Sequence, residues 1–462
     1  MKTTFLTRLS ATFLGASLCA LGAPIFAQNS SAPAANSAAS FAAPTPEKLP
    51  NGLEFLAIPD RTSPRVAFSI LLHAGAEAEG ADTAGWRRLV VNAMLRRAPG
   101  DESGNLESLR RAAETLGGEI GASVGDDLIE IYGVGPSENG PQLLELALAL
   151  LDKPTLSDAD LDAARNRQLD QIEAQEWELA ARIGETLRGQ LFRSNSGELL
   201  AYGLPEQGTA LSLRALSNDK LRELWASLKT VKMTVSAVGD TNAPALRQIL
   251  ANRAMPARAF SWPAPQFAPI KGDAPPLVVR EFPVRNAWIF VSFPAKVAPA
   301  DAPALRVALA ALSESRAARL STRLLNTQLA TGDSPALTVS SQIVARRHAS
   351  EVMLSAQTNP QNVDRVKNAL VDEAKKLATR PLSPLELERA KLYARGSWSL
   401  ERQNLRERAF LSGQSAALEF GADFSMPARL QSVSAEQVAQ AAKKYFGQYA
   451  VALVMPRDVD EE

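Results

Sequence analysis

Residues 156–165 read L-S-D-A-D-L-D-A-A-R, and residues 382–391 read L-S-P-L-E-L-E-R-A-K. In each stretch a Ser is followed three residues later by an acid, which is the pattern of a capped helix start. Pro384 stands in the first turn of the second helix, where proline is tolerated. The same helix signal thus occurs twice, about 220 positions apart.

Two further pairs of segments repeat at nearly the same spacing. Residues 217–238 and 434–454 each contain a Ser cap, an amphipathic helix and an apolar strand, T-V-S-A-V in the first and V-A-L-V-M in the second. Strand-like runs also open the two copies, at Val66–Leu72 and Ala287–Phe293. These pairs predict an internal duplication. The alternative is a chain of two unrelated α/β domains.

Within each copy the apolar pattern predicts strands mixed with helices. Leu128–Val134 alternates as a strand, whereas Leu144–Leu151 and Leu161–Phe192 have helical spacing. We therefore predict an α+β protein of two tandem homologous α/β-sandwich halves, each a mixed sheet with helices on one face. The halves are residues 47–254 and 277–458, joined by a proline-rich, extended linker at 255–276.

Composition excludes several classes of protein. The chain has 462 residues, of which 46% are apolar, so global disorder is not expected. Its 50 basic residues equal its 50 acidic residues, whereas nucleic-acid binders normally carry a basic excess. We expect no nucleic-acid partner.

The first 27 residues have the order of a secretory signal peptide. Lys2 and Arg8 precede an apolar stretch from about Leu9 to Ala23, and cleavage is plausible after Ala27. The alternative is a membrane anchor. Residues 28–46 read as a flexible tether. Because the sole cysteine, Cys19, lies in this first segment, we expect an exported, periplasmic mature chain with no disulfide and no membrane-spanning segment.

Several motifs resemble those of the insulinase/pitrilysin-type zinc peptidases, in order along about residues 48–456. They are L-P-N-G-L-E-F at 49–55, A-G-A-E-A-E-G at 74–80, T-A-G-W-R-R-L-V-V-N-A-M-L at 83–95, L-G-G-E-I-G-A-S-V-G-D-D at 116–127, A-Y-G-L-P-E-Q-G at 201–208 and R-N-A-W-I-F-V-S-F-P at 285–294. The resemblance implies the same duplicated fold.

The catalytic motif of that family, H-x-x-E-H in a helix, is missing. By resemblance its zinc ligands and general base fall on Arg88, Asn92 and Val91, and the third ligand falls near Gln171. Arginine does not bind zinc and valine cannot accept a proton. His73 and His348 lie in different halves and offer no helical pair. We expect no cofactor in this chain, and no hydrolysis by the family mechanism.

Arginines near the matched motifs have two interpretations each. Arg87 and Arg88 are either ordinary helix residues or cations that contact a peptide carboxylate. The resemblance also implies a substrate-holding Arg, which falls on Arg323, with Arg319 as a competing alignment. The Tyr that accompanies it falls at about Leu337, so its hydroxyl is absent.

One peptide-binding element of the family is retained. The segment I-G-A-S-V, formed by Ile120, Gly121, Ala122, Ser123 and Val124, matches the edge strand to which relatives add a peptide. This mode needs only exposed backbone groups, and two small residues would permit close approach. The alternative is a simple blunted edge.

The sequence therefore predicts an exported, non-catalytic insulinase-like protein. The first hypothesis is that it is the inactive partner of a zinc-bearing homologue with an H-x-x-E-H motif, and that the pair encloses peptides. The alternative is a stand-alone or self-paired protein that binds peptides or serves in assembly. A third, less favoured hypothesis is an active zinc metalloendopeptidase with a divergent site.

Overall fold

The structure is a computed structural model that describes residues 45–457, except 102–106, 176–178, 195, 256–258, 266–269, 271–276, 331 and 419–424. The predicted signal peptide and nearly all of the predicted tether lie outside the described residues. Within the described ranges, no helix is both long and apolar enough to cross a bilayer.

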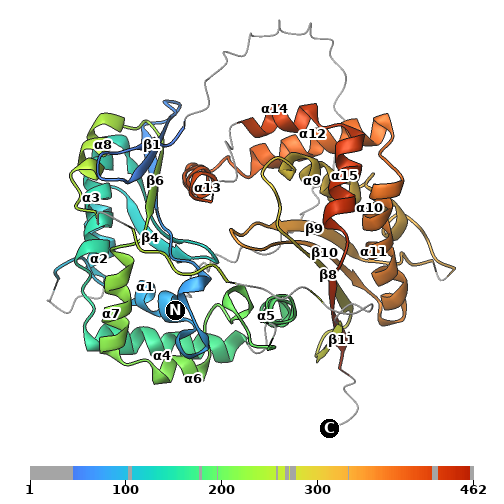
Figure 1. Ribbon diagram of the computed structural model, residues 1–462, viewed down its shortest axis with the longest axis horizontal. Helices are drawn as coiled ribbons and strands as arrows, with labels where there is room; N and C mark the ends of the chain where they lie inside the picture. Colours follow the sequence, from blue (N-terminus) through green and yellow to red (C-terminus); the bar gives the residue numbers. More distant parts are fainter. Residues whose placement is uncertain are drawn as a thin grey trace, which may run out of the picture. The chain divides into compact units, whose positions relative to one another are not determined.

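Each half of the chain builds one mixed β-sheet (Figure 1). The first sheet has the order β1-β2-β6-β3-β5-β4, and the second has the order β7-β11-β8-β10-β9. The strands are β1 Glu47–Lys48, β2 Glu54–Pro59, β3 Arg65–Leu72, β4 Glu119–Val124, β5 Ile129–Pro136, β6 Met233–Gly239, β7 Leu277–Phe282, β8 Ala287–Ala295, β9 Thr338–Val344, β10 Ser350–Thr358 and β11 Ala450–Pro456.

The two sheets share one topology. Strand β2 runs parallel to β6 and β7 runs parallel to β11, whereas the other neighbouring strands are antiparallel. Apart from the short β1, each strand of the first sheet has a counterpart at the same place in the second. A duplicated sequence is expected to give this arrangement.

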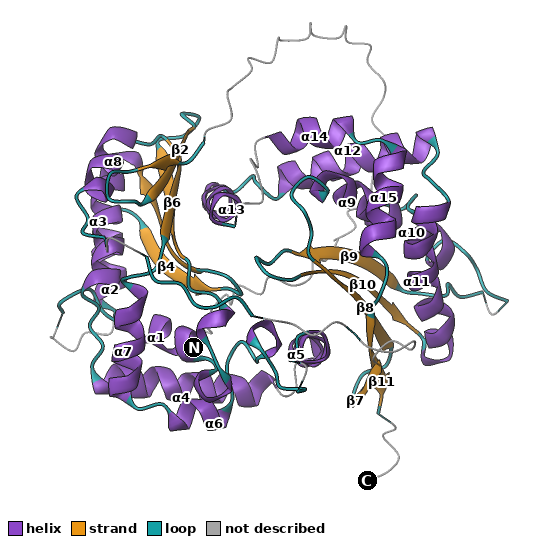
Figure 2. Cartoon of the chain, in the orientation of Figure 1, coloured by secondary structure: helices purple, strands orange, loops and turns teal. Residues whose placement is uncertain are grey.

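Helices cover one face of each sheet (Figure 2). The α-helices are α1 Trp86–Met94, α2 Ser108–Thr115, α3 Gly140–Asp152, α4 Asp158–Gln175, α5 Leu179–Leu191, α6 Ala210–Ala215, α7 Asn218–Leu228, α8 Ala243–Ala251, α9 Ala302–Leu309, α10 Arg319–Leu324, α11 Val363–Thr379, α12 Pro384–Leu400, α13 Leu405–Ala417, α14 Met426–Ser432 and α15 Ala435–Tyr445. Two main apolar cores lie between sheet and helices, one in each half.

The predicted Ser caps are present at both repeated helix starts. The Ser383 hydroxyl accepts a hydrogen bond from the Glu386 amide at 3.3 Å, and the Glu386 carboxylate accepts one from the Ser383 amide at 2.8 Å. The Ser157 hydroxyl likewise accepts from the Asp160 amide at 3.2 Å. These local signals predict the helix starts correctly because they act within a single turn.

The segment predicted as helical, Leu161–Phe192, is occupied by α4 and α5, with residues 176–178 outside the described residues, and the two helices have different packing partners. Helix α4 packs on α1 in the first half, whereas α5 contacts β11 and β7 of the second sheet. The apolar side of α5, with Ile183, Leu187 and Leu191, forms a cluster with residues of β11. Helix α13 of the second half reciprocally packs on β3 and β6. Each sheet is thus covered by a helix of the other half on its second face.

Candidate functional site

Helix α1 carries the positions that match the zinc motif, and its first turn is held by a buried carboxylate. Glu79 accepts hydrogen bonds from the amides of Gly85 at 3.1 Å and Arg87 at 3.3 Å, and pairs with the Arg87 Nε at 3.0 Å. Arg87 also donates to the carbonyl groups of Ala74 at 3.1 Å and Gly125 at 2.9 Å. Arg87 is therefore a structural residue that fastens α1 to the neighbouring loops.

The loop after α5 closes tightly on the start of α1. Gly85 and Gly208 both have positive φ, 86° and 75°, and a Cβ on Gly208 would lie 2.2 Å from the Ala84 carbonyl oxygen. The Gln168 amide of α4 donates to the Gly85 carbonyl at 3.0 Å and to the Gln207 carbonyl at 2.7 Å. Two segments that match family motifs, 83–95 and 201–208, therefore contact each other, and the Gln168 side chain of α4 binds both.

The residues at the motif positions do not fit zinc. Val91 is buried, Arg88 and Asn92 are half-buried on α1, and Gln171 is half-buried on α4. A guanidinium and an aliphatic side chain supply no ligand, and carboxamides bind zinc poorly compared with His or Cys. In the part of the chain that the structure describes, no group of three or more His, Cys, Asp and Glu side chains could hold a metal ion.

Arg88 instead contacts both the loop after α5, through Glu206, and the edge strand β4, through Val124. Its guanidinium lies 3.6 Å from the Glu206 carboxylate and donates to the Val124 carbonyl at 3.4 Å. Burial lowers the pKa of Arg88, and Glu206 opposes that effect. Its Nε is buried and has no hydrogen-bond partner. Glu206 also pairs with Arg188 of α5, so Arg88 is a weakly satisfied cation at the end of β4.

The segment Ile120–Val124 lies in β4, at the edge of the first sheet. Its small residues have a function inside the chain: a Cβ on Gly121 would come within 2.4 Å of the Tyr132 hydroxyl, so glycine makes room for that ring. Arg406 of α13 stacks over Tyr132 at 3.9 Å. Ser123 donates to the buried Glu130 at 3.0 Å.

Arg323 lies in the helical layer of the second half. On α10 it pairs with Glu373 of α11 at 2.8 Å and lies 3.8 Å from Asp372. The competing residue Arg319 pairs with Glu386 at 2.9 Å. Leu337 is exposed just before β9. The contacts of Arg323 are therefore those of an ion-paired helix residue, and they do not link it to β4.

Sequence reasoning missed a polar network that joins the two halves. The β4–β5 turn carries Asp126 and Asp127, and the β9–β10 turn carries Arg346 and Arg347. Arg346 pairs with Asp126, and Asp127 accepts hydrogen bonds from the Arg347 amide at 2.9 Å and the Tyr202 hydroxyl at 2.5 Å. Burial raises the pKa of Asp127. The signal was present in the sequence as an acidic pair and a basic pair about 220 residues apart.

His73 belongs to the same network and is neutral. Arg347 donates to its Nδ1 at 2.8 Å, so the proton is on Nε2, which donates to the Thr234 hydroxyl at 3.0 Å. That hydroxyl in turn donates to Glu54 at 3.1 Å. Burial, with the charges of Arg347 and Lys232, lowers the pKa of His73 to about 3. Both ring nitrogens are engaged within the chain.

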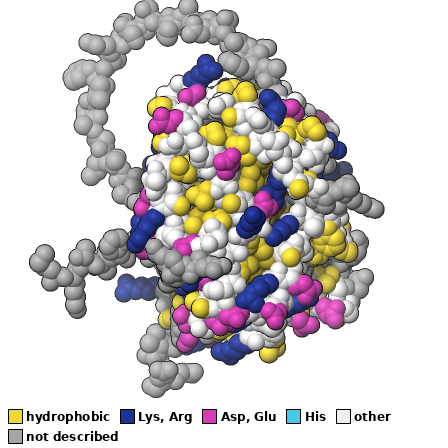
Figure 3. Space-filling model, turned by 90° about the vertical axis from the view of Figure 1, so that its left-hand side faces the viewer, with side chains coloured by type: hydrophobic (Ala, Val, Ile, Leu, Met, Phe, Trp, Pro, Cys, Tyr) yellow, Lys and Arg dark blue, Asp and Glu magenta, His cyan; other side chains and the backbone are white. Residues whose placement is uncertain are grey.

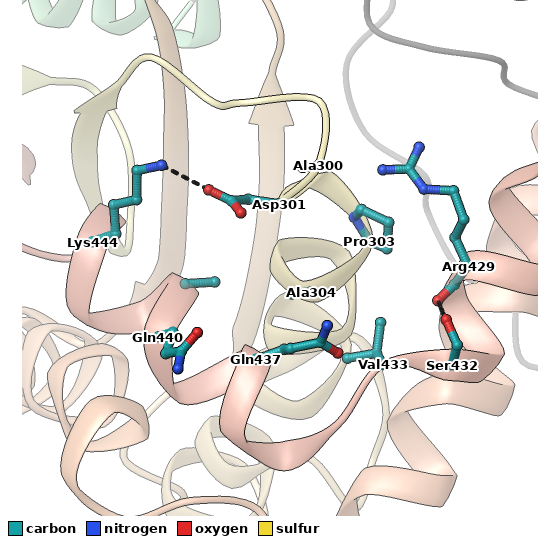
Figure 4. Close-up of a pocket in the computed structure, with 11 residues that line it drawn as sticks. Ala300, Asp301, Pro303, Ala304, Arg429, Ser432, Val433, Gln437, Gln440 and Lys444 are labelled. Atoms are coloured by element: carbon teal, nitrogen blue, oxygen red, sulfur yellow. Dashed lines mark hydrogen bonds and ion pairs between the residues drawn. The ribbon is translucent and has the colours of Figure 1, made fainter.

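A cavity of about 450 Å³ lies elsewhere, between α9, α14 and α15 (Figure 4). Its charged side chains have partners: Lys444 pairs with Asp301 at 2.8 Å, and Arg429 donates to the Pro299 carbonyl. Figure 3 shows a face of the molecule on which acidic and basic side chains are interspersed, with no field of a single sign. Neither feature indicates a charged ligand.

Comparison with known proteins finds a family that resembles part of this chain. Residues 215–393 match the family described as "Peptidase M16 inactive domain". The match covers less than half of the chain, and over these residues the chain is similar to the M16 inactive domain. The motif positions on α1 lie outside the matched residues, and there the M16-like chain carries Arg, Val and Asn, so it lacks the catalytic motif. No curated protein matches it in sequence.

Solved structures show that the likeness in fold extends over nearly the whole chain. The peptidase M16 inactive domain from Pseudomonas fluorescens is 16% identical and has a TM-score of 0.76, over 91% of this chain and 100% of that one. A protease from Helicobacter pylori is 15% identical, with a TM-score of 0.73 over 90% and 100%. A chain of complex III2 from Candida albicans is 15% identical, with a TM-score of 0.71 over 89% and 95%.

Proposed function

We propose that this M16-like protein is an exported, non-catalytic subunit that pairs with a zinc-bearing homologue and helps to enclose peptides. The observation that carries the proposal is the contrast between the retained fold and the lost motif. The fold likeness covers 91% of the chain, yet Arg, Val, Asn and Gln occupy the metal and base positions. A protein that retains the peptidase fold but lacks the zinc ligands and the general base can still act as a structural subunit of a peptidase complex.

The similar chain of complex III2 from Candida albicans supports this reading, because it shows the fold as a component of a larger complex. A catalytic partner would supply the zinc and the general base that this chain lacks. This chain would supply walls and backbone groups that hold the peptide. Export rests on the signal-like order of residues 1–27.

Strand β4 is the proposed peptide contact. As an edge strand it offers backbone N–H and C=O groups to an added strand, a mode that needs no metal. Arg88 already binds the Val124 carbonyl at the end of β4 and has an unpartnered Nε. A peptide lying along β4 would bring a carbonyl or terminal carboxylate to this guanidinium, which binds such groups through several donors.

The deciding experiment is mass spectrometry of the proteins that co-purify with the tagged chain from its native envelope fraction. A near-stoichiometric H-x-x-E-H homologue is the expected result. If repeated mild extraction yields none, the chain is a stand-alone or self-paired peptide-binding protein. If the pure chain holds stoichiometric zinc and cleaves unfolded peptides, both non-catalytic functions are overturned.

Peptide binding is tested separately by hydrogen exchange. Addition of unfolded peptides is expected to slow amide exchange in residues 119–124 and to leave β9, the corresponding edge of the second sheet, unchanged. Arg88→Met should weaken this protection, whereas the matched control Arg323→Met should not. Equal protection of both edges, or none, would contradict the assignment of β4.

A further inference from the structure

Helix α12 exposes an apolar stripe that the described chain leaves uncovered. Leu385 is 60% exposed, Leu392 63%, Tyr393 42% and Leu400 64%. The leucines, together with Gly396, recur at helical spacing, so they share one side of the helix over about 22 Å. The opposite side packs on α9 and α14 and buries Ala390 and Ala394. Large leucines exposed in a row are unusual on a monomeric surface.

The duplicated half provides an internal comparison. Helix α4 is the counterpart of α12 in the sequence repeat, and its equivalent positions are exposed as well. They carry small or polar residues: Ala159, Asn166, Arg167 and Ala174. The fold therefore does not require apolar residues on this side of the helix. The apolar stripe is therefore present only in the second half of the chain, on α12, and not on the equivalent helix α4 of the first half.

Gly396 is a second, independent observation on the same stripe. It lies in the interior of α12, where glycine destabilises a helix relative to alanine. It is exposed, and a Cβ added to it would have no atom within 4 Å. No contact inside the chain thus explains this glycine. A side chain of another molecule crossing the helix between Leu392 and Leu400 would need the space.

We propose that α12 docks antiparallel on α12 of a second copy of this chain. With the two-fold axis between residues 392 and 393, Leu385 of each copy faces Leu400 of the other. At the centre Leu392 meets the second copy's Tyr393. The stem of Arg389, which lies on the same side of α12, crosses the second copy's Gly396, where its aliphatic part packs and its charge reaches solvent.

The stripe is self-complementary, and this favours a second copy over an unrelated partner. The large apolar residues of one helix lie opposite large apolar residues of the other. The long side chain of Arg389 lies opposite Gly396, which has no side chain. An isologous contact requires this property, because the same patch serves both subunits. A single helix pair is smaller than a standard interface, so the dimer should be weak and concentration-dependent. This proposal does not rest on the catalytic partner proposed above.

The first test is sedimentation equilibrium of the full chain over a range of concentrations. The wild-type chain should dimerise, and Leu392→Glu should weaken the dimer at least tenfold. The control is Leu211→Glu, since Leu211 is 82% exposed on α6, away from the stripe, and its replacement should change nothing. A monomer at every concentration, or a dimer that tolerates Leu392→Glu, would overturn the proposal.

The second test fixes the register by disulfide formation in a Cys19→Ser background, which has no other cysteine. A mixture of the Leu385→Cys and Leu400→Cys chains should cross-link on oxidation, whereas either chain alone should not. Cross-linking of single variants alone would contradict the antiparallel arrangement. If Leu392→Glu abolishes capture of a zinc-bearing homologue and the pure chain stays monomeric, the stripe belongs to that partner and self-docking is wrong.

Discussion

Arg346 pairs with Asp126, and these two residues stand 220 positions apart at equivalent places in the duplicated halves. Asp126 lies in the turn between β4 and β5, and Arg346 lies in the turn between the corresponding strands β9 and β10. Identical copies would bring like charges together at this contact. Because one turn became acidic and the other basic, equivalent turns attract each other across the two halves.

Reversing one charge of this pair should destabilise the protein strongly. Although burial raises the pKa of Asp126, Arg346 and Arg188 lower it, so the carboxylate is ionised. Asp126→Arg would place three guanidinium groups together and should cost roughly 3–5 kcal/mol of unfolding free energy. Urea denaturation measures this cost, and adding Arg346→Asp should recover part of it. The surface pair of Arg110 and Glu114 is the control, and Arg110→Ala should change little. Failure of the double variant to recover stability would argue against a direct pair.

His73 should contribute a decrease in the free energy of unfolding as the pH is lowered from about 6.5 to 5. Its pKa is about 3 in the folded chain and 6.5 when unperturbed, so only the unfolded state binds a proton in this range. The contribution of His73 to stability is therefore complete above pH 6.5 and declines on acidification, by up to about 1.4 kcal/mol per pH unit. Burial raises the pKa of Glu314 to about 7, so this carboxyl contributes a slope of the opposite sign in the same range. The contribution of His73 is therefore measured as the difference in slope between the wild type and His73→Gln, by denaturation at several pH values. The less buried His348 serves as control, and His348→Gln should remove less of the slope.

Much of the fold was predictable because its signals are local. Ser383 and Ser157 mark helix starts by contacts within one turn, and the strands follow from short apolar runs. The different packing partners of α4 and α5 could not be predicted in the same way. Apolar spacing continues through both helices, and only tertiary packing shows that Ile183 faces the second sheet. Exchange of helices between the halves is likewise a long-range property.

The candidate site was predictable in what it lacks rather than in what it does. Substitution at Arg88 and Val91 is visible in the sequence, and it excludes the family's zinc chemistry. The different roles of the neighbours Arg87 and Arg88 were not visible, because they depend on Glu79 and Glu206, which approach from separate loops. The ion pairs of Arg323 with α11 also required the packed structure.

Arg87 and Arg88 should respond very differently to the same substitution. Arg87→Met removes one partner of a buried ion pair with Glu79 and should cost about 3–5 kcal/mol of unfolding free energy. Arg88→Met removes one long hydrogen bond and a half-exposed ion contact, so it should cost less than about 1 kcal/mol. Parallel urea denaturation of the two variants makes the comparison. Equal costs would mean that Arg88 is as structural as Arg87.

Gly208→Ala should be among the most damaging small substitutions in the first half. The residue has φ 75°, and the new Cβ would lie 2.2 Å from the Ala84 carbonyl oxygen. Backbone strain and the clash should together cost about 3 kcal/mol or more. Gly197→Ala is a matched control, because Gly197 has φ 90° but nothing within 4 Å of its Cβ, so only about 1 kcal/mol is expected. Thermal denaturation of both separates the clash from the strain.

Zinc binding should be restored by placing ligands at the motif positions. Arg88→His with Asn92→His puts two imidazoles one turn apart on α1, and Gln171→Glu adds a carboxylate from the neighbouring helix α4. The triple variant should retain stoichiometric zinc through dialysis, measured by elemental analysis, whereas the wild-type chain should retain none. Arg87→His in place of Arg88→His is the control, because that position is on another side of α1. A second triple variant carries Gln168→Glu in place of Gln171→Glu, because Gln168 already contacts the start of α1. If only this second variant retains zinc, the third zinc ligand belongs at position 168. Since Val91 cannot accept a proton, hydrolysis of peptides should remain absent until Val91→Glu is added.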